Sequence, residues 1–399
     1  MKADIKHRMG RRCKEWDYGQ RAIYMVTLTL AERGKPLLAG WPEKLRNIAV
    51  SGNAQNGTAY ERRGDAQDGT RVPPRFCASP ETARYRCPPT PLGEKTLACW
   101  QRIPEFWPTV SLFEAVVMPD HFHGILFVEE PLPAGKTLGD IIRGFKTGCK
   151  EVEWAAGFVD TIIFHDNQLK TMAAYIRDNP YRLAEKRANP ALFQRVTSLS
   201  LPLGGGRFTG HFEAVGNRHL LERPLWQVQC SRRFFAWHRV PKPGGGVKIA
   251  RDTACAPVVE RASAEYEERL EEALAAAAHG AVIVCPCISD GERQIALEIH
   301  RRKLPLVALR NMGFSQMEKP AGRLFEACSE GRLLLLAPAA WPHLTQKKPM
   351  TRLDATALNR ICQWLVGEDA AEINYHGMKP VDIDRIALDA VQPTSGNRV

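Results

Sequence analysis

Two histidines separated by one residue are the first side chains in this sequence that could hold a metal ion. His121 and His123 lie in "VVMPDHFHGILFV" (residues 116–128), which otherwise has the apolar content of a buried strand. Side chains alternate between faces along a strand, so both imidazoles point the same way, about 7 Å apart along the backbone. Two such imidazoles can bind one ion. A His-x-His pair is a weak motif by itself, and the site needs further partners.

A tyrosine and an amide on a predicted helix supply these partners. The segment "HDNQLKTMAAYIRDNPYRLAEK" (165–186) carries apolar residues at helical spacing, namely Leu169, Met172, Ala173 and Ile176. Tyr175 flanks this apolar face, and Asn179 lies one turn later on the same side. Pro180 disfavours the helical conformation of the residue before it, so we expect the helix to end near Asn179.

Together these four side chains would make a site for nicking a DNA strand. A phenol with a pKa of about 10 is a poor nucleophile unless its target is made electrophilic. A divalent metal held by two imidazoles polarises a phosphate oxygen and positions the scissile bond for in-line attack by a phenol. An amide one helical turn after the tyrosine is well placed to complete the coordination of the metal.

Each candidate residue also has a purely structural interpretation. His121 and His123 would then be strand histidines beside a turn, without metal, and Tyr175 would be a packing tyrosine at the edge of an apolar face. Asn179 would cap the end of the helix before Pro180.

Composition sets the broad class of the protein. A chain of 399 residues is long enough for two domains, and its apolar and charged fractions are those of a soluble globular protein. No apolar run reaches the length of a membrane span, and the N-terminal residues lack the apolar core of a signal peptide, so we expect a cytoplasmic protein with no membrane partner. Eleven Cys without a regular spacing indicate neither a disulfide framework nor a zinc ribbon.

The positive charge is concentrated in the first part of the sequence. Residues 1–256 hold 38 Lys and Arg against 25 Asp and Glu, whereas residues 257–399 hold 17 against 19. A basic half beside a nearly neutral half indicates that the first half meets a polyanion, with nucleic acid as the leading candidate.

The elements of the first half must position the candidate site. "AIYMVTLTL" (22–30) predicts a first strand, residues 44–90 have the composition of an exposed insertion, and Pro119-Asp120 joins the histidine strand to the strand before it as a β-hairpin. A helix over 137–155 carries Lys146 and Lys150 one turn apart, which form either a DNA track or a solvated face. Strands in "FEAVGNRHLL" and "PLWQVQCS" are expected to close a domain spanning 1–240, followed by a linker over 241–257.

The second half has a different pattern. Apolar strands alternate with helices over 258–368, which predicts a parallel sheet covered on both faces, and residues 369–399 are expected to form a tail. We interpret Cys285 and Cys287 of "CPC" as two small buried thiols at the end of a strand rather than a redox or metal pair.

Two family resemblances extend these predictions. "VVMPDHFHGILFV" followed by "YIRDNPYRLA" resembles the REP-associated tyrosine transposases, which belong to the His-hydrophobic-His (HUH) endonuclease superfamily. The resemblance covers roughly residues 15–240 and implies an α+β ferredoxin-like core that cleaves single-stranded or hairpin DNA with Mg²⁺ or Mn²⁺, leaving a 5′-phosphotyrosine. It assigns His121 and His123 as metal ligands, Tyr175 as the nucleophile and Asn179 as the third ligand. Imidazoles are better ligands for transition ions than for Mg²⁺. We therefore expect Mn²⁺ to be the better cofactor in vitro.

The insertion and the second domain depart from the simple members of that family. Residues 258–366 more loosely resemble the Rossmann-like fold of the DNA-processing protein A group. We therefore expect a metal-dependent single-strand DNA endonuclease and strand transferase of transposase type, whose α/β domain is an accessory platform for DNA or a partner protein. The alternatives are a catalytically silent protein that binds structured DNA, and a nucleotide-directed activity in the C-terminal domain. No glycine-rich phosphate motif supports the last of these.

Overall fold

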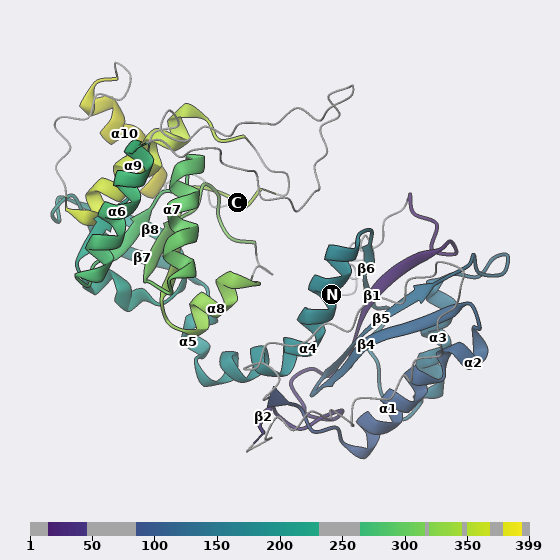
Figure 1. The fold of residues 1–399 in the computed structure, drawn as a ribbon. Helices are drawn as coiled ribbons and strands as arrows, with labels where there is room; N and C mark the ends of the chain where they lie inside the picture. The colour runs from purple at the N-terminus through teal and green to yellow at the C-terminus, as the bar shows by residue number, and fades with distance from the viewer. Residues whose placement is uncertain are drawn as a thin grey trace, which may run out of the picture. The chain divides into compact units, whose positions relative to one another are not determined.

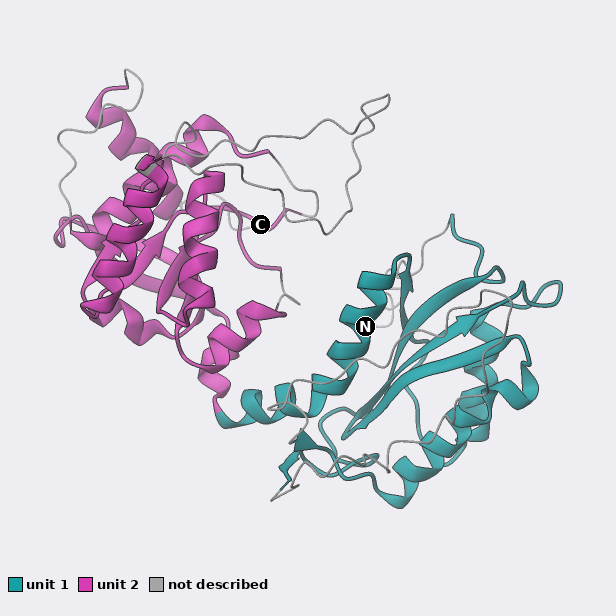
Figure 2. Ribbon diagram, viewed as in Figure 1, with its two compact units in different colours: residues 1–188 teal, residues 189–399 magenta. Residues whose placement is uncertain are grey.

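The computed structural model describes residues 15–45, 85–230, 264–315, 319–344, 349–367 and 378–392. The chain divides into two compact units, Met1–Ala188 (unit 1) and Asn189–Val399 (unit 2) (Figure 2). The expected linker over 241–257 and most of the expected insertion, 46–84, lie outside the described residues.

Unit 1 is built on a four-stranded antiparallel sheet in the order β4-β5-β1-β6. Its elements are β1 (Ala22–Thr29), β2 (Glu43–Lys44), β3 (Tyr85–Arg86), α1 (Pro91–Gln101), α2 (Ile103–Phe106), β4 (Val110–Met118), β5 (His121–Val128), α3 (Leu138–Gly148), β6 (Val159–Ile163) and α4 (Asp166–Ala188). Without the short β2–β3 pair and the one-turn helix α2, the order up to β6 is β-α-β-β-α-β, an order of elements that ferredoxin-like folds also have. The predicted hairpin at Pro119-Asp120 is confirmed by the pairing of β4 with β5.

Helices cover both faces of this sheet (Figure 1). On one face α1 and α3 pack through Trp100, Ile141 and Phe145 against Phe122 and other apolar strand residues. On the opposite face, a smaller apolar cluster joins α4 to the strands; its buried members are Met25, Ile125, Ile163, Leu169, Ala173 and Ile176. Because side chains alternate along β5, Phe122 points toward α1 and α3, whereas His121, His123 and Ile125 point toward α4.

Unit 2 contains a six-stranded sheet in the order β7-β8-β12-β11-β10-β9. Its elements are α5 (Pro190–Phe193), β7 (Val196–Leu203), β8 (Phe208–Gly216), the 3₁₀ helix η3 (Arg218–Glu222), β9 (Leu225–Gln227), α6 (Ala264–Ala278), β10 (Val282–Cys285), α7 (Asp290–Arg301), β11 (Leu306–Leu309), α8 (Arg323–Ser329), β12 (Leu333–Pro338), α9 (Arg352–Val366) and α10 (Pro380–Val391). Strands β9 to β12 are parallel, and β8 runs antiparallel to β12. Helices α6, α7 and α8 cover one face, and α9 and α10 cover the other, so the predicted two-sided α/β sheet is confirmed.

The boundary between the units differs from the one predicted at residue 240. The strands expected to close the first domain, β8 and β9, instead pair with β12 and β10 of the second sheet. The composition of these segments predicts strands but does not predict which strand each one pairs with. The strands with which they pair lie far along the chain. The expected tail is also corrected, because Ala387, Ala390 and Val391 of α10 are buried in the same apolar cluster as residues of α9.

With the boundary after residue 188, the charged side chains divide differently between the two parts of the chain. Unit 1 holds 28 Lys and Arg against 22 Asp and Glu, and unit 2 holds 27 against 22. The positive excess is therefore shared almost equally between the units. Within the described residues, none of the helices has the length and apolarity needed to cross a membrane.

Candidate functional site: a histidine pair beside Tyr175

The histidine pair lies at the start of β5, between two neighbouring strands. In the sheet register, His121 stands opposite Met118 of β4 and Thr29 of β1, and His123 stands opposite Val116 and Thr27. The two imidazole ring centroids are 4.8 Å apart, and the ring planes are inclined by 82°. The strand therefore brings both rings to one place, as the His-x-His spacing predicts.

The ring of His121 is oriented by the neighbouring aspartate. Its Nδ1 lies 2.6 Å from Oδ1 of Asp120, and Oδ2 of Asp120 accepts a hydrogen bond from the backbone N–H of Gly34 at 3.0 Å. The hydrogen bond with His121 is the main reason that the pKa of Asp120 falls to about 2, so this carboxylate stays ionised. A carboxylate held on Nδ1 leaves Nε2 of His121 as the nitrogen for a metal ion.

His123 is held in a similar way by a hydroxyl group. Oγ1 of Thr27 lies 2.7 Å from Nδ1 of His123. His123 is only 5% exposed. Burial, with a smaller contribution from His121, lowers the pKa of His123 to about 3. The imidazole is therefore neutral at physiological pH, and only a neutral imidazole can be a metal ligand.

Tyr175 reaches this pair from α4. The apolar residues Leu169, Ala173 and Ile176 pack the helix on the sheet, and the ring of Tyr175 contacts that of His123 edge-on, with centroids 5.7 Å apart. Tyr175 is 37% exposed, so its side chain is accessible from solvent. The guanidinium carbon of Arg182 lies 5.5 Å from the centre of the Tyr175 ring and adds positive charge beside it.

Asn179 lies inside α4 rather than at its end, so both the predicted helix end and the capping interpretation are wrong. The helix continues through Pro180 to Ala188, and Ile176, Asn179 and Pro180 are all buried. The Nδ2 group of Asn179 donates a hydrogen bond to the carbonyl oxygen of Tyr175 at 2.9 Å. This contact ties the amide to the turn that carries the tyrosine and leaves the side-chain oxygen as an acceptor.

The two lysines do not accompany the histidines. Nζ of Lys146 donates to the carbonyl oxygens of Ala155 and Gly157 at 2.7 and 2.6 Å, and its burial lowers its pKa. Lys146 therefore holds the loop before β6, whereas Lys150 is exposed. Since α3 packs on the sheet face opposite the histidines, neither lysine forms a track beside Tyr175.

The donor set beside Tyr175 fits a divalent cation of borderline or transition type. Among the described residues, no group of three or more His, Cys, Asp and Glu side chains is arranged to hold a metal ion. The set here is of another kind, two imidazoles and an amide oxygen. His123 is neutral, and each histidine has its Nδ1 engaged and its Nε2 remaining for a metal. These features fit a borderline or transition ion better than a purely oxygen-seeking one.

Sequence patterns did not indicate three residues of this site. Thr27 could be found only by aligning β1 with β5, and Arg182 only once the helix was known to continue past Pro180. Asp120 directly precedes His121 in the sequence, but the Pro119-Asp120 pattern predicts only a turn there and gives no sign of a contact with the imidazole.

Comparisons with known proteins give weak similarities. No family model matches the chain. An uncharacterized protein from Haemophilus influenzae (strain ATCC 51907 / DSM 11121 / KW20 / Rd) is 29% identical over 116 residues, a match that covers 22% of this chain and 64% of that protein, just under two thirds of its length. A solved structure of a REP-associated tyrosine transposase bound to a REP hairpin matches 43% of this chain and 73% of its own, with 15% identity and a TM-score of 0.26. These similarities do not assign the chain to a family.

Proposed function

We propose that unit 1 is an HUH-type, metal-dependent endonuclease and strand transferase that acts on single-stranded DNA. The observation that carries the proposal is the convergence of His121, His123 and Tyr175, with ring centroids 4.8 and 5.7 Å apart, from a strand and a helix far apart in the sequence. Two adjacent imidazoles, of which His123 is buried and neutral, lie beside an exposed phenol, and this combination suits metal-assisted cleavage of a phosphodiester by a tyrosine.

The metal would be held by Nε2 of His121, Nε2 of His123 and the side-chain oxygen of Asn179. A bound Mg²⁺ or Mn²⁺ would polarise an oxygen of the scissile phosphate. Asp120 and Thr27 would fix the two rings through their Nδ1 atoms, in the way that outer residues usually orient metal-binding histidines. The imidazole donors favour Mn²⁺ over Mg²⁺ in vitro.

In the proposed reaction, the hydroxyl oxygen of Tyr175 attacks the phosphorus atom. A tyrosine O–P bond forms, the bond from phosphorus to the 3′ oxygen breaks, and the phenolic proton passes to solvent while the leaving 3′ oxygen gains one. The products are a 5′-phosphotyrosine and a free 3′-OH. In strand transfer, a second 3′-OH attacks this phosphorus atom and loses its proton to solvent, the tyrosine O–P bond breaks, and the phenolate oxygen of Tyr175 takes up a proton. Arg182 beside the ring would stabilise the developing negative charge.

Covalent trapping tests this function directly. The full-length protein is incubated with 5′- or 3′-labelled hairpin oligonucleotides that carry single-stranded flanks, with Mn²⁺, Mg²⁺ or chelator, and resolved on a denaturing gel. We expect a metal-dependent adduct that Tyr175→Phe abolishes, while DNA binding stays within a few fold because the substitution changes no charged side chain. Tyr181→Phe is the matched control, since Tyr181 lies on the same helix but its ring contacts that of Tyr85 at a tilted angle.

The contrary outcomes are distinct. An adduct that still forms with Tyr175→Phe would show that another residue is the nucleophile. Hairpin binding by the wild-type protein, with no adduct in either metal, supports instead a catalytically silent protein that recognises structured DNA.

A further inference from the structure

The loop after β10 in unit 2 holds two thiols in contact. The thiol of Cys287 donates to Sγ of Cys285 at 3.5 Å. In an extended strand, residues two apart are separated by about 6.5–7 Å, whereas here the chain turns after Cys285, where β10 ends. Cys287 provides this turn with a left-handed backbone, φ 54°, which is uncommon for a residue other than glycine.

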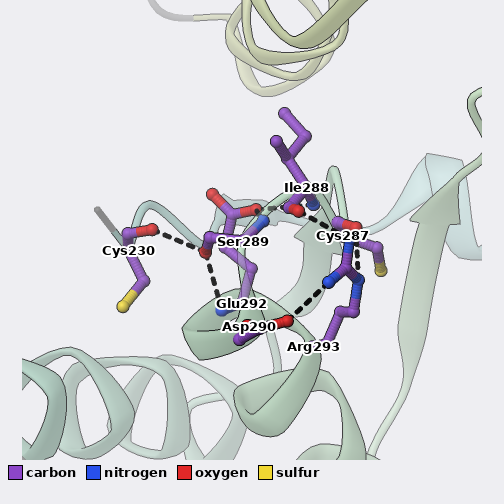
Figure 3. Close-up of polar contacts among 7 residues, drawn as sticks. All are labelled: Cys230, Cys287, Ile288, Ser289, Asp290, Glu292 and Arg293. Atoms are coloured by element: carbon purple, nitrogen blue, oxygen red, sulfur yellow. Dashed lines mark hydrogen bonds and ion pairs between the residues drawn. The ribbon is translucent and has the colours of Figure 1, made fainter. Parts of the chain in front are cut away.

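The surrounding groups hold the loop in this conformation (Figure 3). The guanidinium of Arg293 donates to the carbonyl oxygens of Cys287 and Ile288 at 3.2 and 2.7 Å. The buried carboxylate of Glu292 accepts from the backbone N–H groups of Ile288 and Ser289 at 2.7 and 2.9 Å. The proximity of the two sulfur atoms is therefore built into the loop rather than left to a free surface segment.

The two thiols differ in exposure. Cys285 is completely buried, whereas Cys287 is partly exposed. The hydrogen bond from Cys287, together with burial, raises the pKa of Cys285 well above its usual value. A reagent from solvent therefore meets Cys287 first, and Cys285 is placed to react with whatever forms on Cys287.

We propose that Cys285 and Cys287 form a reversible intraloop disulfide in response to a peroxide. The thiolate of Cys287, whose proton has passed to solvent, attacks one oxygen of hydrogen peroxide and the O–O bond breaks. A sulfenic acid is formed, and the departing hydroxide takes a proton from solvent and becomes one water. The sulfur of Cys285 then attacks Sγ of Cys287, losing its proton while the hydroxyl group leaves as a second water. One peroxide is reduced by two electrons, and two thiols become one disulfide, with a bond of about 2.05 Å.

Tryptic mapping of the full-length protein tests this site. Cleavage after Arg269 and Arg293 releases a peptide, residues 270–293, whose only cysteines are Cys285 and Cys287. After treatment with hydrogen peroxide, denaturation and alkylation, we expect this peptide to be lighter by two hydrogen atoms and to carry no alkyl group. Treatment with dithiothreitol before alkylation should restore two alkyl groups.

Variants assign the order of reaction. Cys285→Ser should leave a sulfenic acid on Cys287 that dimedone traps, and Cys287→Ser should abolish oxidation of the peptide. Cys328→Ser removes a buried cysteine of α8 and should leave the linkage unchanged. The proposal is overturned if the wild-type peptide still takes two alkyl groups after peroxide, or if dimedone labels only Cys285. The wild-type mapping decides the existence of the linkage even where a variant does not fold.

Discussion

At the scale of single residues, His123 determines how the site responds to pH. Its pKa is about 3 in the folded protein, because the ring is buried, and about 6.5 in an unfolded chain. Between these values the unfolded chain binds a proton that the folded protein does not, so acidification through this window favours unfolding. The loss is at most about 1.4 kcal/mol per pH unit from this one group.

We therefore expect the free energy of unfolding to fall from pH 6.5 to pH 4 more steeply in the wild-type protein than in His123→Gln. Denaturant titrations at several pH values measure the slope. His219→Gln is the control, because the side chain of His219 is 82% exposed. Equal slopes in all three proteins would show that His123 titrates normally.

Thr27 gives a second prediction at this scale. Thr27→Val keeps the shape of the side chain but removes the hydroxyl group that lies 2.7 Å from Nδ1 of His123. We expect Mn²⁺ binding to weaken by roughly 10- to 100-fold, as is typical when an outer hydrogen-bond partner of a metal ligand is lost. Isothermal titration calorimetry measures the change.

The matched control is Thr29→Val. Thr29 lies on β1, as Thr27 does, and stands opposite His121 of β5. If both variants bind Mn²⁺ like the wild type, Thr27 does not orient a metal ligand. The sequence could predict the histidines, which share a local motif, but not Thr27. That contact joins residues 96 positions apart and depends on the register of two strands.

At the scale of elements, the packing of β5 against α1 positions the histidines. Gly124 follows His123 and faces the buried ring of Trp100. A Cβ atom at Gly124 would lie 2.5 Å from Cζ2 of that ring and 2.8 Å from Cε2. Trp100 is 2% exposed and is packed on several sides, so it cannot move aside freely.

Gly124→Ala should therefore destabilise unit 1 by about 1–3 kcal/mol, the usual cost of overpacking. Gly144→Ala is a control with the opposite expected sign. Gly144 lies in α3, a Cβ there would meet nothing within 4 Å, and alanine in a helix is favoured over glycine by roughly 0.5–1 kcal/mol. Thermal unfolding of both variants measures the difference, and a stabilising Gly124→Ala would contradict this view of the β5 packing.

Most elements could be predicted from local patterns, and α4 shows where local patterns fail. The alternation in β1 and β5 and the helical spacing in α7 are properties of neighbouring residues. Pro180 is also a local signal, and it predicts the wrong helix end. The helix continues because Ile176, Asn179 and Pro180 are buried in its tertiary environment, which sequence spacing does not reveal.

At the scale of the whole molecule, the pairing of distant strands decides where one unit ends. The sequence shows a contrast in net charge between a basic half and a neutral half only when the chain is divided near residue 256. With the boundary after Ala188, both units carry a similar positive excess. Sequence composition could predict two folded parts and their classes. It could not predict that β8 joins β12, because that pairing unites Ala214 with Leu336 across more than a hundred residues.

Two truncations test this boundary. Residues 1–188 contain every strand of the sheet that carries His121 and His123, so this fragment should fold, remain monomeric and form the Tyr175 adduct. Residues 1–240 add β7, β8 and β9 but lack β10 and β12, with which β9 and β8 pair. Unpaired strands and uncovered apolar side chains such as Phe212 should make this longer fragment aggregate and bind a hydrophobic dye.

Light scattering and dye fluorescence compare the two fragments at equal concentration. A monomeric, dye-negative fragment 1–240 together with an unfolded fragment 1–188 would restore the boundary at residue 240.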